Sequence, residues 1–331
     1  MIYLLLPHPG HGRIYDTAAE SAALAELRAM IPRAAVCAAE IAGMHWFSLE
    51  AEPELSPREL EKLSQSSLYL ALFAREGELL RPIPPEEWRY LPDSLNTILK
   101  YSGKTNERFT RMLVNLACSC CGNLRPVPTL LDPMCGQGTT LFEAAIRGWN
   151  AIGLETKESS AHACGTYFVS FLEKGGYKHR RREEKRTKEG KRIAQLTAID
   201  YASTKEAWRR EDFRTLSVFR ADSALCAQLL PKNAADLLVC DLPYGVQHGA
   251  AGASGLSRDA SALVRSCAAG WKQALRPGAG LALAYNTFTT PRKKLALALE
   301  DAGFTVLPPV EGMEHRVDQS ILRDVILARR E

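Results

Sequence analysis

The first ninety residues alternate short apolar runs with segments in which apolar positions recur three and four residues apart. Short apolar runs between turn residues predict strands, and the longer spacing predicts helices. The pattern predicts a strand over 2–6, a helix over 18–30, strands over 34–41 and 44–50, a helix beginning at Ser56-Pro57 and a strand over 68–73. The order β-α-β-β-α-β is typical of a small ferredoxin-like α+β domain, which we assign to residues 1–90.

A proline-rich stretch, Arg81-Pro82-Ile83-Pro84-Pro85, follows this unit. Proline removes a backbone donor and restricts the preceding residue, so the stretch predicts a break in regular structure and a domain boundary near residue 90. Residues 106–118 carry apolar side chains at helical spacing. We therefore expect residues 91–118 to be a linker followed by a packing helix.

From residue 129 onward, apolar strand patterns alternate with helical ones, which predicts a Rossmann-like, doubly wound α/β sheet over residues 119–331. The expected strands are 129–131, 151–154, 217–220, 237–240, 281–285 and 321–328. The gap between the second and third strands is unusually long. It holds a helix, a basic segment and a further strand-helix pattern over 193–208, so residues 174–215 are predicted to be an insertion.

Charge is unevenly distributed, although the net charge of the chain is only +4. Residues 174–192 contain ten Lys or Arg and three Glu, a surplus of +7. Such a segment can bind nucleic-acid phosphates, and the alternative is a solvated or partly disordered arm. The residues expected to bind phosphates are Lys178, Arg180, Arg181, Arg182, Lys185 and Arg186.

Composition limits the classes of protein considered. No apolar stretch is long enough to span a membrane, and the nine cysteines have irregular spacings, which indicates a cytoplasmic protein with reduced thiols. Cys118, Cys120 and Cys121 cluster, but no second pair of ligands follows at a fitting spacing. We expect these thiols to pack at a helix end and expect no metal.

The turn after the strand at 129–131 reads Asp132-Pro133-Met134-Cys135-Gly136-Gln137-Gly138-Thr139. Its glycines allow close approach of a ligand, and Glu155, at the end of the next strand, is suited to ribose hydroxyls. The third carboxylate, Asp222, follows another strand and could reach an adenine amino group, although an aspartate there is more often a helix cap.

Two features favour S-adenosylmethionine over a dinucleotide at this turn. A dinucleotide loop has a third glycine three positions after the second, where this chain has Leu141. Asp132 repels phosphate and suits the ammonium and sulfonium of S-adenosylmethionine. The remaining alternative is an ordinary strand-turn-helix that binds no ligand.

A second motif, Asp241-Leu242-Pro243-Tyr244-Gly245, follows the strand at 237–240. The lone pair of an aromatic amine is delocalised into the ring, so an enzyme that methylates it must hold both N–H bonds with acceptors. Asp241 and a carbonyl of Leu242 or Pro243 would accept them, and Tyr244 would stack on the base. The glycine-rich residues 245–255, with His248, are expected either to order over the base or to form an idle surface loop.

Together the motifs at 132–139 and 241–245 resemble those of the tRNA guanosine N2-methyltransferases usually associated with THUMP domains. Residues 111–117 resemble that family's approach to its first motif, and the similarity covers about 106–285. The resemblance implies that the helix beginning near Thr105 closes over the methionine end of the cofactor. The residues assigned to the cofactor are Asp132, Pro133, Cys135, Gly136, Gly138, Thr139, Glu155 and Asp222, and those assigned to the target base are Asp241, Leu242, Pro243 and Tyr244.

The resemblance implies S-adenosylmethionine-dependent methylation of an exocyclic amino group, with guanosine N2 in tRNA as the expected target and RNA as the partner. The chain departs from the family in leaving too little length for a THUMP domain. The alternatives are methylation of adenine or cytosine amino groups in DNA, methylation of a protein glutamine, and RNA binding without turnover. The sequence leaves the oligomeric state open.

Overall fold

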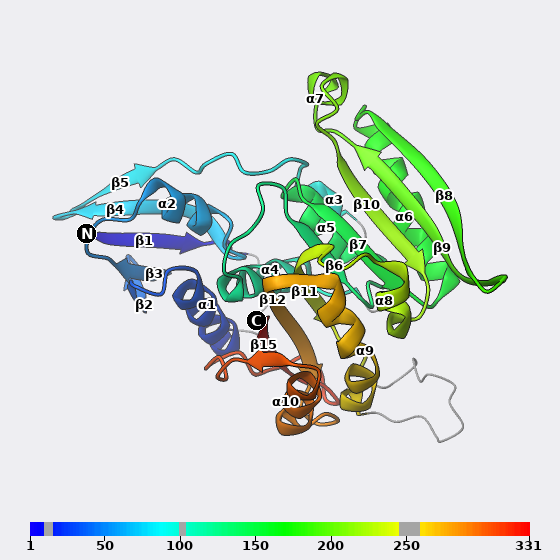
Figure 1. The fold of residues 1–331 in the computed structure, drawn as a ribbon. Coiled ribbons are helices and arrows are strands. Elements are labelled where there is room, and N and C mark those ends of the chain that lie inside the picture. Colours follow the sequence, from blue (N-terminus) through cyan, green and yellow to red (C-terminus); the bar gives the residue numbers. More distant parts are fainter. Residues whose placement is uncertain (10–15, 99–103, 245–258) are drawn as a thin grey trace.

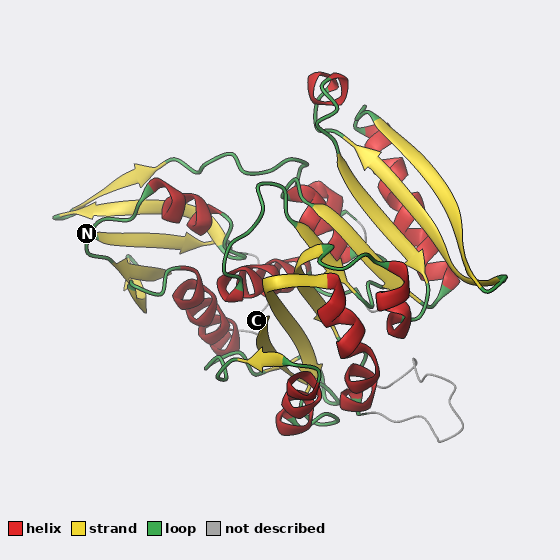
Figure 2. Cartoon of the chain, in the orientation of Figure 1, coloured by secondary structure: helices red, strands yellow, loops and turns green. Residues whose placement is uncertain are grey.

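The computed structural model of the chain describes residues 1–9, 16–98, 104–244 and 259–331. These residues form a small antiparallel sheet and a larger mixed sheet with helices on both faces (Figures 1 and 2). The small sheet and the β8–β9 hairpin of the large sheet lie at opposite ends of the molecule (Figure 1).

The small sheet confirms the predicted ferredoxin-like arrangement. Its elements are β1 (Ile2–Pro7), α1 (Asp16–Met30), β2 (Ala35–Ile41), β3 (Met44–Glu50), α2 (Pro57–Ser64), β4 (Tyr69–Glu76) and β5 (Leu79–Ile83). The strand order is β2-β3-β1-β4-β5, with β1 antiparallel to both of its neighbours. Ser56 caps α2 in a capping box with Glu59, which explains why the helix begins there.

The break expected at residues 81–83 is wrong. Arg81, Pro82 and Ile83 belong to β5, in which Pro82 lies opposite Phe73 of β4. Because β5 is the edge strand, the missing N–H of Pro82 leaves no inner partner unsatisfied. The domain boundary near residue 90 stays a prediction.

The large sheet begins after the predicted packing helix, which is confirmed as α4 and is capped by Asn106. Its strand order is β13-β15-β12-β11-β6-β7-β10-β9-β8, with β14 beside β15. The elements up to the sheet centre are α3 (Ser94–Thr97), α4 (Glu107–Cys120), β6 (Thr129–Asp132), α5 (Thr139–Ile146), β7 (Asn150–Glu155) and α6 (Glu158–Lys174). The later elements are β8 (His179–Lys188), β9 (Lys191–Tyr201), α7 (Lys205–Arg209), β10 (Arg214–Arg220), η1 (Ser223–Leu225), α8 (Cys226–Leu229), β11 (Ala235–Asp241), α9 (Ala260–Ala274), β12 (Leu275–Asn286), α10 (Arg292–Asp301), β13 (Phe304–Val306), β14 (His315–Arg316) and β15 (Leu322–Arg330).

The central strands β12, β11, β6, β7 and β10 are mutually parallel, as predicted for a doubly wound sheet. One core packs α4, α5 and α6 on one face, and a second packs α8, α9 and α10 on the other. Helix α4 crosses β12 at Gly280, where an added Cβ would lie 2.0 Å from the carbonyl oxygen of Ala117. Only glycine permits this approach of helix to strand.

The predicted insertion is an ordered β-hairpin. Strands β8 and β9 pair antiparallel and extend the sheet beyond β10, so a partly disordered arm is wrong. Most side chains of β8 are exposed, as in the alternative of a solvated segment. The turn residues Glu189 and Gly190 have φ of 51° and 76°, as in the tight turns that suit the twist of a hairpin. The strand-helix pattern expected over 193–208 is confirmed as β9 and α7.

A buried polar network joins the small sheet to the large one. Glu26 of α1 is fully buried and accepts a hydrogen bond of 2.6 Å from Asn115 Nδ2 of α4. The side-chain oxygen of Asn115 accepts from Arg147 at 2.8 Å, and Arg147 donates to Glu143 at 2.9 Å. Glu143, also fully buried, binds Arg111 of α4 at 3.0 Å. The network therefore fixes α4 between α1 and α5.

We expect Glu143→Ala to lower the free energy of unfolding by about 3–5 kcal/mol, because removing one partner leaves buried guanidinium groups without their counter-charge. The matched control is Asp301→Ala, which breaks the exposed 2.6 Å pair with Arg265 and should cost no more than about 1 kcal/mol. Urea unfolding of the two variants measures the difference. Equal losses would contradict the structural role of the network.

Candidate active site

The two sequence motifs meet at the carboxyl edge of adjacent parallel strands. In β6 and β11, Leu131 lies opposite Leu238, so Asp132 lies level with Val239. Asp241 extends two residues further on the neighbouring strand, which is about 7 Å along the chain direction. The charge of Asp241 contributes to the raised pKa of Asp132. The structure thus brings the two motifs to one place.

The loop 132–139 is pressed against β7 and α6. The N–H of Gly136 donates to Glu155 at 3.0 Å, and the N–H of Cys135 donates to the Leu154 carbonyl at 3.0 Å. Gly138 has φ of 95°, and a Cβ there would lie 2.4 Å from the Cys164 sulfur. Glycine is therefore required both by the backbone conformation and by the close packing. The turn leads directly into α5, whose first residue is Thr139.

Asp132 is a buried carboxylate with 3% of its surface exposed. It accepts a hydrogen bond from the Met134 N–H at 3.0 Å, and none of the described Lys, Arg or His side chains forms an ion pair with it. Burial raises the pKa of Asp132 to about 7. A buried acid that lacks a cationic partner fits a positively charged ligand, so the residues of this loop fit S-adenosylmethionine.

Glu155 and Asp222 both have local partners. Glu155 accepts from Gly136 N and from Lys157 N, the latter at 2.7 Å. Asp222 is exposed and accepts from Ala224 N at 2.8 Å, which confirms that it caps the short helix η1. Strand pairing places Arg220 level with Glu155, so both acids lie along the same edge as Asp132. Cys135 is buried, so its thiol packs beneath the loop.

Asp241 is held by three side chains from different elements. Thr105 donates to its Oδ2 at 2.8 Å, the Tyr244 hydroxyl donates to its Oδ1, and Arg323 approaches Oδ2 at 3.5 Å. This contact ties Thr105, which precedes α4, to Asp241. That the helix closes over the methionine end of the cofactor stays a prediction. Leu242 is buried, and its N–H donates to the Ala284 carbonyl at 2.9 Å, which anchors the motif to β12. Pro243 is half-buried.

Tyr244 lies against protein in this structure. Its hydroxyl accepts from Arg323 Nε at 2.6 Å while donating to Asp241. Burial raises the pKa of Tyr244 well above its usual value, and the nearby Asp241 charge adds to the shift. The phenol therefore stays protonated.

Arg323 of β15 is the site residue that the motifs did not reveal. It is 8% exposed, and its guanidinium carbon lies 4.3 Å from the Phe109 ring centre and 5.4 Å from that of Tyr244. Stacking between two aromatic rings suits a planar guanidinium. The available signal was an Arg323-Asp324 pair near the start of a predicted strand whose other residues are apolar.

The basic residues expected to bind phosphates lie away from Asp241, on the far side of β6, β7, β10 and β9. Arg180 and Arg182 both pair with the buried Asp200, at 2.8 and 3.0 Å. Arg181 pairs with Glu183, and Arg186 with Glu184. Lys178 and Lys185 form no ion pair with any described side chain.

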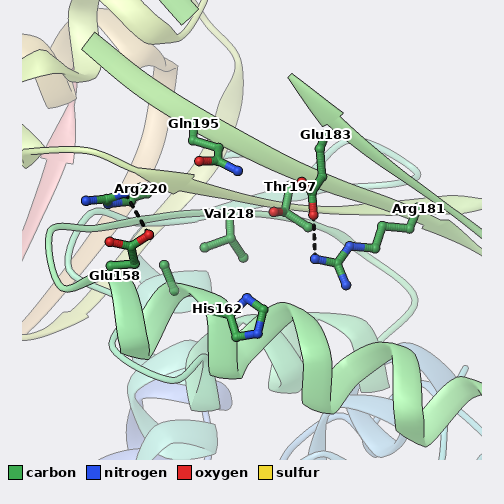
Figure 3. A pocket seen from close by; sticks show the side chains of 9 residues that line it. Glu158, His162, Arg181, Glu183, Gln195, Thr197, Val218 and Arg220 are labelled. Carbon is green, nitrogen blue, oxygen red and sulfur yellow. Dashed lines mark hydrogen bonds and ion pairs between the residues drawn. The ribbon is translucent and has the colours of Figure 1, made fainter. Parts of the chain in front are cut away.

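A polar groove lies between α6 and the hairpin, lined by residues that Figure 3 labels. One ion pair, Arg220–Glu158 at 2.9 Å, joins β10 to α6, and another, Arg181–Glu183 at 2.6 Å, lies within β8 (Figure 3). His162 of α6 accepts or donates to Thr166 at 3.3 Å. The charges of these two pairs neutralise one another within the protein.

Other expectations concern metals, membranes and the glycine-rich loop. Among the described residues, no three His, Cys, Asp or Glu side chains are grouped so that they could hold a metal. No helix in the same part of the chain combines the length and apolar character needed to cross a membrane. The glycine-rich segment 245–255 and His248 lie outside the described residues.

Comparison with known proteins identifies one family. The model of a family described as RMKL-like, methyltransferase domain, matches residues 99–304, which is more than half of the chain. No curated protein matches the sequence.

Several solved structures are similar in fold. TehB from Haemophilus influenzae has 15% identity and a TM-score of 0.39, over 66% of this chain and 61% of that one. This chain thus spans less than two thirds of the length of TehB. Magnesium protoporphyrin IX methyltransferase from Synechocystis PCC 6803 has 12% identity and a TM-score of 0.40, over 72% of this chain and 90% of that one. A SAM-dependent methyltransferase from Methanosarcina mazei has 14% identity and a TM-score of 0.37, over 62% of this chain and 94% of that one.

We expect Arg323→Met to lower the free energy of unfolding by about 2 kcal/mol, because Asp241 and Tyr244 lose a charged donor. Arg323→Lys should lose less, since it keeps the charge but not the planar stack. The control is Arg329→Met on the same strand, whose pair with Glu331 is exposed. Urea unfolding tests whether the loss of unfolding free energy is largest for Arg323→Met, smaller for Arg323→Lys and smallest for the control. A methionine variant as stable as the control would refute the role of Arg323.

Proposed function

This chain belongs to the family of RMKL-like methyltransferase domains and uses S-adenosylmethionine as its methyl donor, and from this premise we propose that it methylates an exocyclic amino group of an RNA base. The proposed target is guanosine N2 in tRNA or another structured RNA. The observation that carries the proposal is the position of Asp241, an amine acceptor, on the strand next to the strand that ends in Asp132.

The residues toward the cofactor have separate roles in this proposal. Asp132 would hold the ammonium group, Glu155 the ribose hydroxyls, and Asp222 the adenine amino group. When bound, the cofactor supplies a methyl group on a positively charged sulfur. The buried position of Asp132 excludes water from its carboxylate, which strengthens its attraction for a cation.

Asp241 would hold the target amine. For this, the Tyr244 hydroxyl leaves Asp241 Oδ1, and Thr105 keeps its hydrogen bond to Oδ2 and so fixes the carboxylate. One amine N–H then donates to Oδ1, and the nitrogen lone pair is directed away from the ring. The released Tyr244 ring is free to stack on the base. When the nitrogen gains the methyl group it loses a proton, which Asp241 or water accepts.

The substrate class is tested by incubating the protein with labelled S-adenosylmethionine and separate pools of RNA, DNA and protein. Label in RNA alone supports the proposal, and label in DNA or protein supports the alternative substrates. Mapping of methylated nucleosides in RNA from cells with and without the protein identifies the position. Failure to bind S-adenosylmethionine in calorimetry would favour an RNA-binding protein without turnover.

We expect Asp241→Ala to reduce methyl transfer at least about 100-fold, the scale of losing one preorganised group that acts in the transition state. Its affinity for S-adenosylmethionine should change little, because the cofactor residues lie on the other strands. Single-turnover transfer and calorimetric titration measure the two effects. The matched control is the exposed Asp301→Ala, which should leave both unchanged. Unchanged transfer by Asp241→Ala would refute the assigned role.

We expect cofactor binding to depend on pH through Asp132. Its carboxyl group has a pKa of about 7 in the free protein, and a bound cation lowers this value. Binding at pH 5.5 therefore releases close to one proton per site, and affinity rises as the pH increases toward 7. Calorimetry in buffers of different ionisation enthalpy counts the proton.

The variant Asp132→Asn provides the comparison for this measurement. It should bind more weakly near pH 7 and release no proton at pH 5.5, because the amide does not titrate. Equal proton release by the two proteins would assign the titration to another group.

A further inference from the structure

The end of the β8–β9 hairpin concentrates positive charge. We define the hairpin tip as residues 185–192, which contain five basic residues and one acidic residue, a net charge of +4. The tip residues without an ion pair to a described side chain are Lys185, Lys188, Lys191 and Arg192. These cations are available to an external anion.

The base of the hairpin differs from the tip. We define the base as residues 180–182, where Arg180 and Arg182 share the buried Asp200 and Arg181 pairs with Glu183. The carboxylates hold the base to its own sheet. The basic run is continuous in the sequence but therefore has two parts. The arginines of the base are paired with carboxylates, whereas most cations of the tip are not.

Strand register places the tip and the base at opposite edges of the sheet. Arg180 pairs across β9 with Asp200, which lies opposite Thr215 near the start of β10. Lys185 pairs with Gln195, which lies opposite Arg220 at the end of β10. The base thus lies at the edge where the parallel strands begin, and the tip extends past the edge where they end.

The tip therefore borders the candidate active site. Arg220 is level with Glu155, and the four residues from Gln195 back to Lys191 continue about 13 Å beyond that level. Lys188 Nζ donates to Gln228 of α8 at 3.1 Å, which ties the tip to the helix that follows Asp222. The tip consequently overhangs the adenosine end of the proposed cofactor site.

A nucleic acid is long enough to reach both places. The order β11-β6-β7-β10-β9-β8 separates Asp241 from β8 by five strand spacings, about 24 Å in a flat sheet. At about 3.4 Å per nucleotide along one strand, this distance corresponds to roughly seven stacked nucleotides. A free nucleoside or a short peptide side chain would not span it.

We propose that the hairpin tip binds the sugar-phosphate backbone of the RNA substrate, several nucleotides from the guanosine that is methylated. Residues 180–182, the base of the hairpin, take no part in this contact. This inference rests on the proposed function, because it supplies the RNA grip for that active site. A competing role for charged residues on an edge strand is to prevent pairing with other chains. That role suits the base as well as the tip and predicts no contribution to RNA binding.

The test compares two charge variants of the full chain. The tip variant carries Lys185→Gln, Lys188→Gln, Lys191→Gln and Arg192→Gln, and the base variant carries Arg180→Gln and Arg182→Gln. The probes are labelled single-stranded RNAs of about 16 and about 4 nucleotides, the limits of typical single-strand site sizes. Binding is measured by fluorescence anisotropy across a salt series, with circular dichroism as the check on folding.

The tip variant should bind the longer RNA at least about tenfold more weakly. Its log-log salt slope should fall by about 3, because each phosphate that the tip no longer neutralises removes about 0.7 from the slope. The base variant should bind like the unchanged protein, and neither variant should alter binding of the shorter RNA or of S-adenosylmethionine. A tip variant that binds the longer RNA normally, or a base variant that alone loses binding, overturns the inference.

Methyl transfer separates this inference from the proposed function. If the unchanged protein methylates RNA and the tip variant does so with the same KM, the inference fails and the proposed function stands. If RNA binding depends on the tip but no pool accepts methyl groups, the proposed function fails and the tip contact stands.

Discussion

The parallel pairing of β6 with β11 is the constraint on which the rest of the site depends. Parallel strands end at the same edge, so the residues that follow them share one surface. Asp132 and Asp241 are 109 positions apart in the chain but occupy neighbouring strands, and the charge of Asp241 contributes to the raised pKa of Asp132. This arrangement places two carboxylates at one edge, although the loops that carry them are far apart in the sequence.

The buried network around Glu143 fixes the position of α4 beside this edge. Arg111 and Asn115 both lie on α4, so their bonds to Glu143 and Glu26 fix the helix on two sides. Thr105, which holds Asp241, precedes the same helix. The small sheet therefore contributes to the active site indirectly, because it helps to position α4 through α1.

The two proposed ligands carry opposite charges, and the regions proposed to bind them are charged accordingly. The edge that ends in Asp132, Glu155 and Asp241 is acidic and suits a cation, whereas the hairpin tip beside it is basic and suits phosphates. Arg323 lies within the acidic region and offsets part of the charge of Asp241.

Local pattern alone predicted most of the strands and helices and the identity of both motifs, but not strands β5 and β8. The strands before Asp132, Glu155 and Asp241 are short apolar runs, and the helix cap at Ser56 depends on residues within one turn, so these features are readable along the chain. By contrast, Pro82 is compatible with a strand only because β5 lies at an edge, and edge position is a property of the assembled sheet.

Tertiary structure decided the rest, because it depends on pairs that are distant in sequence. Arg323 joins the site through strand pairing that carries β15 next to β12, and the pairing of Arg180 with Asp200 divides the basic run in two. Whether a charge is free or neutralised depends on which residues fold against it. The sequence by itself therefore determined the chemistry of the two motifs, and only the fold decided which charges remain available to a ligand.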